Sequence, residues 1–181
     1  MRLWIAVIVT SLTLATSGCA FVSRSCTEMG CVSGATFSAP VASDSDALAG
    51  MVLTLCRDAA CTTGAIVETR PCASCPPRLA VRLSGPLDVS ADLLPAGDQL
   101  ASDGGTTVIS SYTLVVTFNA KTDAARDALA NGDVYVVRLA PARGGAAVID
   151  VTKSVTYAKV QPNGADCDGA FYCRSASLNG G

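Results

Sequence analysis

The nine cysteines of this 181-residue chain constrain its fold more than any other feature. Nine cysteines cannot all pair with one another, so at least one must have a role other than an internal disulfide bond. The identity of that odd cysteine decides how the other eight are interpreted. The set comprises Cys19, Cys26, Cys31, Cys56, Cys61, Cys72, Cys75, Cys167 and Cys173.

The first cysteine ends a segment with the features of an export signal. Met1 and Arg2 give a positively charged start, and residues 3–15 form an apolar run that is shorter than the roughly 20 residues of a membrane-spanning helix. Small residues follow, and Ser17-Gly18-Cys19 resembles the lipobox of bacterial lipoproteins. The resemblance implies that residues 1–18 are a cleaved signal peptide and that lipidated Cys19 anchors the mature chain to a membrane.

A second interpretation of the same segment stays open. Cleavage after Ala20 would release a soluble secreted protein and discard Cys19 with the leader. Both interpretations remove Cys19 from the pool and leave an even set of eight cysteines in an exported protein. Because exported proteins meet an oxidising environment, we expect these eight to form disulfide bonds.

Spacing divides the eight cysteines into four local couples. Closing a short loop costs less chain entropy than closing a long one, so neighbours in sequence are the expected partners. The clearest couple flanks residues 57–60, a four-residue loop between two strand-like segments, where facing residues come within disulfide distance. The predicted bonds are Cys26–Cys31, Cys56–Cys61, Cys72–Cys75 and Cys167–Cys173.

Cys72 and Cys75 also have the C-x-x-C spacing of thiol–disulfide redox centres. Such centres open a helix, whereas here Pro71 precedes the couple and Pro76 follows it. A zinc site that combines this couple with Cys56 and Cys61 is chemically sufficient, but it conflicts with an oxidising compartment. A structural disulfide is therefore the favoured interpretation.

The composition excludes several classes of function. The chain has no histidine, which excludes catalysis and metal binding through histidine. Its net charge is −2 and its basic residues are scattered, so we expect no nucleic-acid partner. Asp166 and Asp168 alternate before Gly169, yet the ligand positions of a calcium loop are missing at both ends. We therefore assign no metal, no cofactor and no catalytic residue.

The remainder of the chain is typical of an all-β protein. Tyr112, Leu114, Val116 and Phe118 alternate with more polar residues, as in a strand with one buried face. A short helix is expected over residues 123–130, between Thr122 or Asp123 as its cap and Asn131-Gly132 as its stop. Segments rich in β-branched residues predict strands over 31–37, 50–56, 61–68, 78–84, 87–93, 106–118, 133–140 and 146–160, the last two as a long hairpin.

These segments predict an antiparallel β-sandwich of immunoglobulin-like or transthyretin-like build with one short helix. The expected organisation is a signal peptide over 1–18, a lipid-attachment cysteine and tether over 19–31, the sandwich over 32–175 and a flexible tail over 176–181. We expect a non-catalytic cell-envelope interaction module, facing the surface or the periplasm, that binds the membrane through Cys19 and an unidentified protein or glycan partner. Ala20 resembles the sorting pattern for an outer membrane, if the organism has one.

Two alternatives to this function stay open. The first is a thiol–disulfide redox protein that uses Cys72 and Cys75, which requires an accessible thiol of low pKa. The second is an aspartate-based hydrolase or a calcium-dependent binder, which requires several aspartates gathered in one cleft.

Overall fold

The computed structural model describes residues 31–41, 45–70, 72, 78–96, 111–168 and 171–179. The predicted signal peptide, the tether as far as residue 30, and Cys19, Cys26 and Cys75 lie outside this part of the chain. Residues 106–110 of one predicted strand and the last two residues of the predicted tail lie outside it as well.

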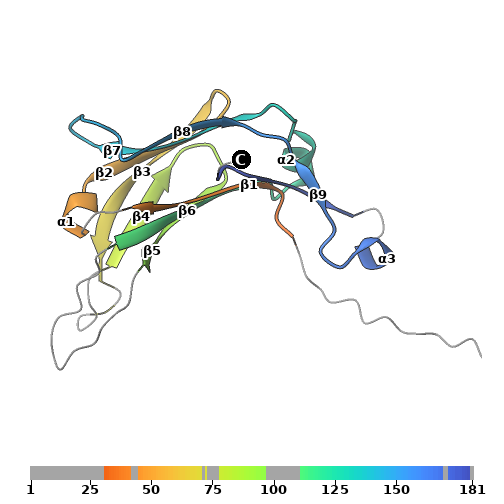
Figure 1. The fold of residues 1–181 in the computed structure, drawn as a ribbon, viewed down its shortest axis with the longest axis horizontal. Helices are drawn as coiled ribbons and strands as arrows, with labels where there is room; N and C mark the ends of the chain where they lie inside the picture. The colour runs from red at the N-terminus through yellow and green to blue at the C-terminus, as the bar shows by residue number, and fades with distance from the viewer. Residues whose placement is uncertain are drawn as a thin grey trace, which may run out of the picture.

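The described residues form two five-stranded sheets that pack as a sandwich (Figure 1). The β1 sheet has the order β5 (Val89–Ala96), β6 (Ser111–Asn119), β1 (Gly34–Val41), β10 (Cys173–Ser177), β9 (Ala158–Val160). The β2 sheet has the order β4 (Arg78–Ser84), β3 (Ala60–Thr69), β2 (Met51–Arg57), β7 (Val134–Pro141), β8 (Ile149–Ser154). Neighbouring strands are antiparallel, except that β1 and β10 run parallel. The predicted all-β sandwich is confirmed.

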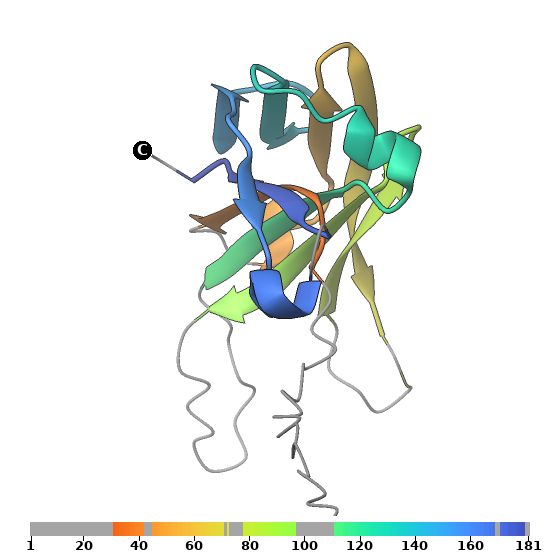
Figure 2. The same cartoon turned by 90° about the vertical axis from the view of Figure 1, so that its right-hand side faces the viewer.

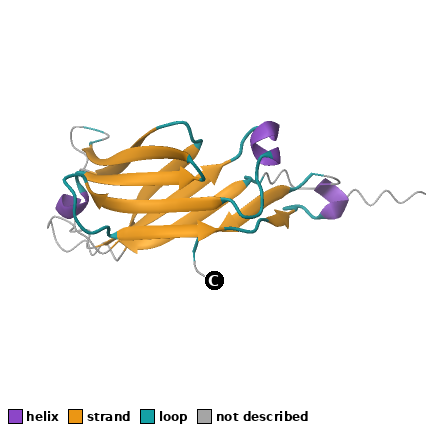
Figure 3. Cartoon of the chain, turned by 90° about the horizontal axis from the view of Figure 1, so that it is seen from above, coloured by secondary structure: helices purple, strands orange, loops and turns teal. Residues whose placement is uncertain are grey.

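Three short helices lie at the ends of the strands (Figure 3). They are α1 (Ser45–Leu48), α2 (Asp123–Asp127) and α3 (Ala165–Asp168). The hydroxyl oxygen of Thr122 accepts a hydrogen bond from the Ala125 amide at 3.1 Å, so the helix predicted from residue 123 starts there. It ends three residues earlier than predicted, because Leu129 turns into the interior and is only 2 % exposed.

The core is formed by the alternating inner faces of the two sheets. In β6 the buried residues are Tyr112, Leu114, Val116 and Phe118, which are the residues that the period of two predicts. Leu53, Leu55, Val137 and Leu139 are fully buried in the opposite sheet and belong to the same cluster. Burial of each such side chain contributes about 1.5–3 kcal/mol, so this alternation is the main source of stability for the sandwich.

The long strand predicted over residues 146–160 is two strands in different sheets. β8 pairs with β7 as predicted, but β9 pairs with β10 in the opposite sheet. The chain crosses between the sheets at residues 155–157, where the Val155 amide donates to the carbonyl of Asp133 at 3.0 Å. The Tyr157 amide donates to Asn131 Oδ1 at 3.0 Å. The loop before β7 provides both of these acceptors where the chain passes from one sheet to the other. The sequence pattern looks like one long strand, although the pairing partner changes from β7 to β10.

The folded domain extends beyond residue 175, where we expected a flexible tail to follow. β10 continues to Ser177, and the Leu178 amide donates to the carbonyl of Thr36 at 2.7 Å. The Leu178 side chain is 3 % exposed and belongs to the core. The expected boundary is wrong because β10 pairs alongside β1, and this pairing holds the residues that follow it.

One predicted disulfide, Cys56–Cys61, is confirmed. The two residues face each other across the β2–β3 hairpin, with their Cα atoms 4.1 Å apart. The connecting loop is tighter than expected, since Arg57 and Ala60 also pair across the hairpin. Asp58 completes the turn with a φ of 51°, a backbone conformation that aspartate tolerates better than most residues.

The predicted bonds Cys26–Cys31 and Cys167–Cys173 are wrong, because Cys31 is bonded to Cys173. The two cysteines are 142 residues apart in sequence, with their Cα atoms 6.0 Å apart. Parallel strands begin at the same end of a sheet, and Cys31 lies just before β1 while Cys173 opens β10. Strand pairing therefore brings together two cysteines that loop length alone would keep apart.

Two further described cysteines, Cys72 and Cys167, are also disulfide-bonded. The predicted bond Cys72–Cys75 includes a residue outside the described part of the chain and stays a prediction. All six cysteines in the described part of the chain are thus in disulfide bonds. This state is typical of a protein that matures in an oxidising compartment.

Candidate binding site at the α2 end of the sandwich

An open pocket of about 350 Å³ lies between α2 and the start of β10. Figure 2 looks onto this end of the molecule, with α2 at the upper right and α3 below β9. Ser33, just before β1, contributes to its wall. The other lining residues are Asp123, Arg126 and Asp127 from α2, and Phe171, Tyr172 and Arg174 from the segment around β10. We call this site the α2-end pocket.

Two aromatic rings of this region each lie against a cation. The guanidinium carbon of Arg126 is 5.7 Å from the centre of the Phe171 ring, and Lys159 Nζ is 4.5 Å from the centre of the Tyr172 ring. Phe171 is 45 % exposed, which is high for a phenylalanine. Each cation–π contact at such exposure contributes about 0.5–1 kcal/mol, so the rings are held in place while remaining accessible.

Arg174 enters the pocket from β10 and is half-buried. Its backbone amide donates to Ser33 Oγ at 3.2 Å, and its Nη1 donates to the carbonyl of Leu129 at 2.6 Å. Among the described residues, no carboxylate oxygen lies within 4.0 Å of its guanidinium. Arg126, by contrast, is paired with Asp123 on the same helix. Arg174 is therefore a half-buried cation whose protein partner is a neutral carbonyl.

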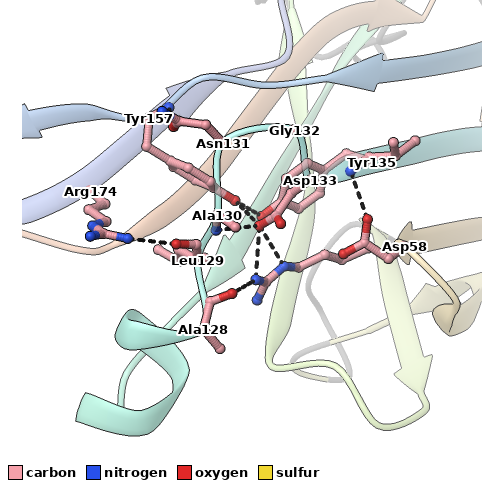
Figure 4. A network of polar contacts seen from close by, with 12 residues as sticks. Asp58, Ala128, Leu129, Ala130, Asn131, Gly132, Asp133, Tyr135, Tyr157 and Arg174 are labelled. Atoms are coloured by element: carbon pink, nitrogen blue, oxygen red, sulfur yellow. Dashed lines mark hydrogen bonds and ion pairs between the residues drawn. The ribbon is translucent and has the colours of Figure 1, made fainter.

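A buried carboxylate, that of Asp133, binds the loop that follows α2 (Figure 4). Asp133 is 7 % exposed. Its Oδ2 accepts from Arg57 Nε at 3.0 Å and Nη2 at 2.9 Å. The same oxygen accepts from the Ala130 amide at 3.3 Å and from the Tyr157 hydroxyl at 2.9 Å. These contacts join strands of both sheets to the loop, because Arg57 ends β2 whereas Tyr157 directly precedes β9.

Two phenols extend this network into the core. The hydroxyls of Tyr135 and Tyr157 are 2.5 Å apart, and the Tyr135 ring packs edge-on against Phe118 at 4.7 Å between ring centres. Burial raises the pKa of both phenols above the ordinary value, and for Tyr157 the hydrogen bonds to Tyr135 and Asp133 raise the pKa further. Arg57, Asp133, Tyr135 and Tyr157 together form what we call the Asp133 network.

Two arginines bind successive carbonyls of the loop between α2 and β7. Arg57 Nη2 donates to the carbonyl of Ala128 at 2.5 Å, and Arg174 Nη1 donates to that of Leu129. These are carbonyls at the end of a helix, where intrahelical donors are missing. Because one arginine comes from each sheet, the loop that follows α2 is fixed to both layers (Figure 4).

The residues singled out in the sequence lie elsewhere or serve the fold. Asp168 accepts from the side chain and the amide of Asn163 at 2.9 and 3.0 Å, which closes a turn. Its neighbour Asp166 belongs to the same short helix, α3. In the part of the chain that the structure describes, no three potential metal ligands of the His, Cys, Asp or Glu type come together.

Sequence reasoning missed the residues that build the site. Asp133 is the first residue of the strand predicted over 133–140 and had no predicted role of its own, and Arg174 stands isolated in the sequence. One local signal was present: Arg57 and Arg174 each directly follow a cysteine, Cys56 and Cys173. Both of these cysteines are in described disulfides, so each arginine extends from a covalently fixed point of the backbone.

Comparison with known proteins gives no match: no family model, no curated protein and no solved structure matches this chain. None of the described helices is both long enough and apolar enough to cross a membrane.

Proposed function

We propose that this chain is an exported interaction module, held at a membrane by lipidated Cys19, that binds a ligand in the α2-end pocket without transforming it. The lipobox-like leader and the disulfide-bonded cysteines support the exported location. The rigid support of the pocket favours recognition, because the loop after α2 is fixed by arginines from both sheets.

The observation that carries this proposal is the Cys31–Cys173 disulfide. It joins the first described residue of the domain to the strand that bears Arg174. In a tethered protein, tension from the membrane side is transmitted to the domain through the chain that precedes residue 31. The covalent bond passes that tension to β10, whose neighbours on both sides are strands of the same sheet. A domain held this way keeps its pocket intact while it is anchored.

The intact mass of the mature protein tests the anchor directly. We expect an acylated N-terminus at Cys19, and a gain of about 2 Da on reduction for each disulfide formed by the eight remaining cysteines. The Cys19→Ser variant should lose the acyl mass and leave the membrane fraction. Cys56→Ser with Cys61→Ser is the matched control, since it changes two cysteines and should stay membrane-bound. An unlipidated mature chain that begins at Phe21 would overturn the anchor.

A further inference from the structure

We propose that the α2-end pocket binds the carboxylate of an acidic side chain in an extended peptide, with Arg174 as its main partner. This inference rests on the proposed function and specifies the ligand class of the same pocket. Its three supports are an incompletely paired cation, a pocket of sufficient size and a nearby exposed strand edge.

The cations around the pocket differ in their pairing. Arg126 is paired with Asp123, whereas among the described residues no carboxylate lies within 4.0 Å of Lys159 Nζ or of the Arg174 guanidinium. Asp127 on α2 and the two aspartates of α3 lie at the same end, so the attraction for an anion is local to Lys159 and Arg174.

Arg174 has unused capacity for a carboxylate. Partial burial of a guanidinium removes water from it, and one neutral carbonyl at 2.6 Å compensates for only part of that loss. The guanidinium has five N–H donors in a planar fork, of which the described contacts use Nη1 alone. A carboxylate that binds this fork in the bidentate manner would provide the missing counter-charge.

The pocket is large enough for an acidic side chain together with neighbouring atoms of a peptide. Its volume of about 350 Å³ is at the lower end of the roughly 300–1,000 Å³ found for small-molecule sites. The exposed ring of Phe171 can pack against the aliphatic stem of that side chain, and Ser33 and Arg174 also line the pocket.

The neighbouring strand favours a peptide over a saccharide. β9 is the outermost described strand of the β1 sheet, and all three of its residues are exposed. Lys159 pairs in register with Arg174, so β9 separates its outer edge from the strand that bears Arg174. An extended peptide added along β9 would gain main-chain hydrogen bonds and would lie two strand spacings, roughly 9.6 Å, from β10. Its acidic side chain would then extend past Lys159 toward the guanidinium of Arg174.

The test uses the mature, fully oxidised protein and fluorescently labelled heptapeptides that alternate valine and threonine around a central residue. We expect the peptide with central glutamate to bind, and its glutamine counterpart to bind at least about tenfold more weakly, because only the carboxylate pairs with the guanidinium. Raising the salt concentration from about 50 to 500 mM should weaken binding of the glutamate peptide, since salt screens exposed charges.

The variants separate charge from structure. Arg174→Gln should weaken binding about tenfold or more, and Arg174→Lys should bind with intermediate affinity because it keeps the charge without the fork. Lys159→Gln and Phe171→Ala change exposed residues and should each weaken binding about threefold. Arg138→Gln is the matched control. Arg138 is a half-exposed arginine of the β2 sheet, away from the pocket, and it is paired with Asp150 on the neighbouring strand. Thermal unfolding verifies that each variant is folded.

Three results would overturn the inference: no binding of the glutamate peptide up to millimolar concentration, equal binding of the glutamate and glutamine peptides, or unchanged binding by folded Arg174→Gln. Binding of polygalacturonate, lost in Arg174→Gln, would replace the peptide by an acidic saccharide while the proposed interaction module stands. The proposed function itself fails separately, when the mature chain lacks the anchor at Cys19.

Discussion

Arg57 and Arg174 bind neighbouring carbonyls of one loop, yet their surroundings differ. Arg57 donates to Ala128 and also to buried Asp133, so its charge is neutralised within the protein. Arg174 donates to Leu129 and has no described carboxylate beside it. The charge of Arg57 is thus neutralised inside the fold, whereas the charge of Arg174 is not neutralised by any described carboxylate. The two arginines differ because Arg57 has a carboxylate partner and Arg174 has only a carbonyl partner. The following substitutions test this difference.

The largest expected effect concerns the disulfides that precede the two arginines. Cys31–Cys173 closes 142 residues, whereas Cys56–Cys61 closes a hairpin, and in the chain-entropy model these bonds are worth about 5 and about 2 kcal/mol. Replacing both cysteines by serine should therefore lower the free energy of unfolding more for Cys31–Cys173 than for Cys56–Cys61. Urea unfolding of the two double variants measures the difference; equal losses would contradict the model.

Removing the carboxylate of Asp133 should have the next largest effect. Asp133→Ala leaves Arg57, whose side chain is 22 % exposed, without its counter-charge and removes the acceptor of Tyr157 and Ala130. We expect a loss of about 3 kcal/mol in the free energy of unfolding. Asp133→Asn preserves the shape and one acceptor oxygen, so its loss should be smaller. Asp127→Ala, an exposed aspartate on α2, is the control and should change stability by less than about 0.5 kcal/mol.

Features that depend on residues close in sequence could be predicted for this molecule, whereas features that depend on contacts between distant segments could not. β6 was predicted with its buried face, because alternation along one strand is a local property. Cys31–Cys173 was missed, because it depends on the parallel pairing of β1 with β10, which follows from the whole topology. Tyr157 was placed inside a long strand, because nothing in its own segment indicates that the loop at Asn131 binds its amide.

The two arginines themselves should differ in their effect on stability. Arg57→Gln leaves buried Asp133 without its cation, and we expect it to lower the free energy of unfolding by about 2–3 kcal/mol. Arg174→Gln removes one hydrogen bond to a carbonyl, worth about 1 kcal/mol, and also relieves a partly desolvated charge. The net loss should therefore be below about 1 kcal/mol. Comparable losses in the two variants would show that both arginines serve the fold alone.

An effect of about the size of one hydrogen bond concerns the phenol of Tyr157, which donates to Asp133. Tyr157→Phe should cost about 1 kcal/mol at neutral pH through the lost hydrogen bond. The pKa of this phenol is raised by burial and by its bonds to Tyr135 and Asp133, so the folded state retains a proton that the unfolded state releases above about pH 10. Its contribution is therefore complete below that pH and is lost as the pH rises.

The wild-type protein should consequently lose stability between about pH 9.5 and 11 more steeply than Tyr157→Phe does. Tyr172→Phe is the control, because the described hydrogen bonds do not include the Tyr172 hydroxyl and its ring contacts Lys159. Urea unfolding at a series of pH values gives the slope for each protein. Parallel slopes for wild type and Tyr157→Phe would show that Tyr157 ionises as easily in the folded state as in the unfolded state. The ion pair of Arg57 and Asp133 would then stabilise the Asp133 network, and the phenol of Tyr157 would add no pH-dependent stability.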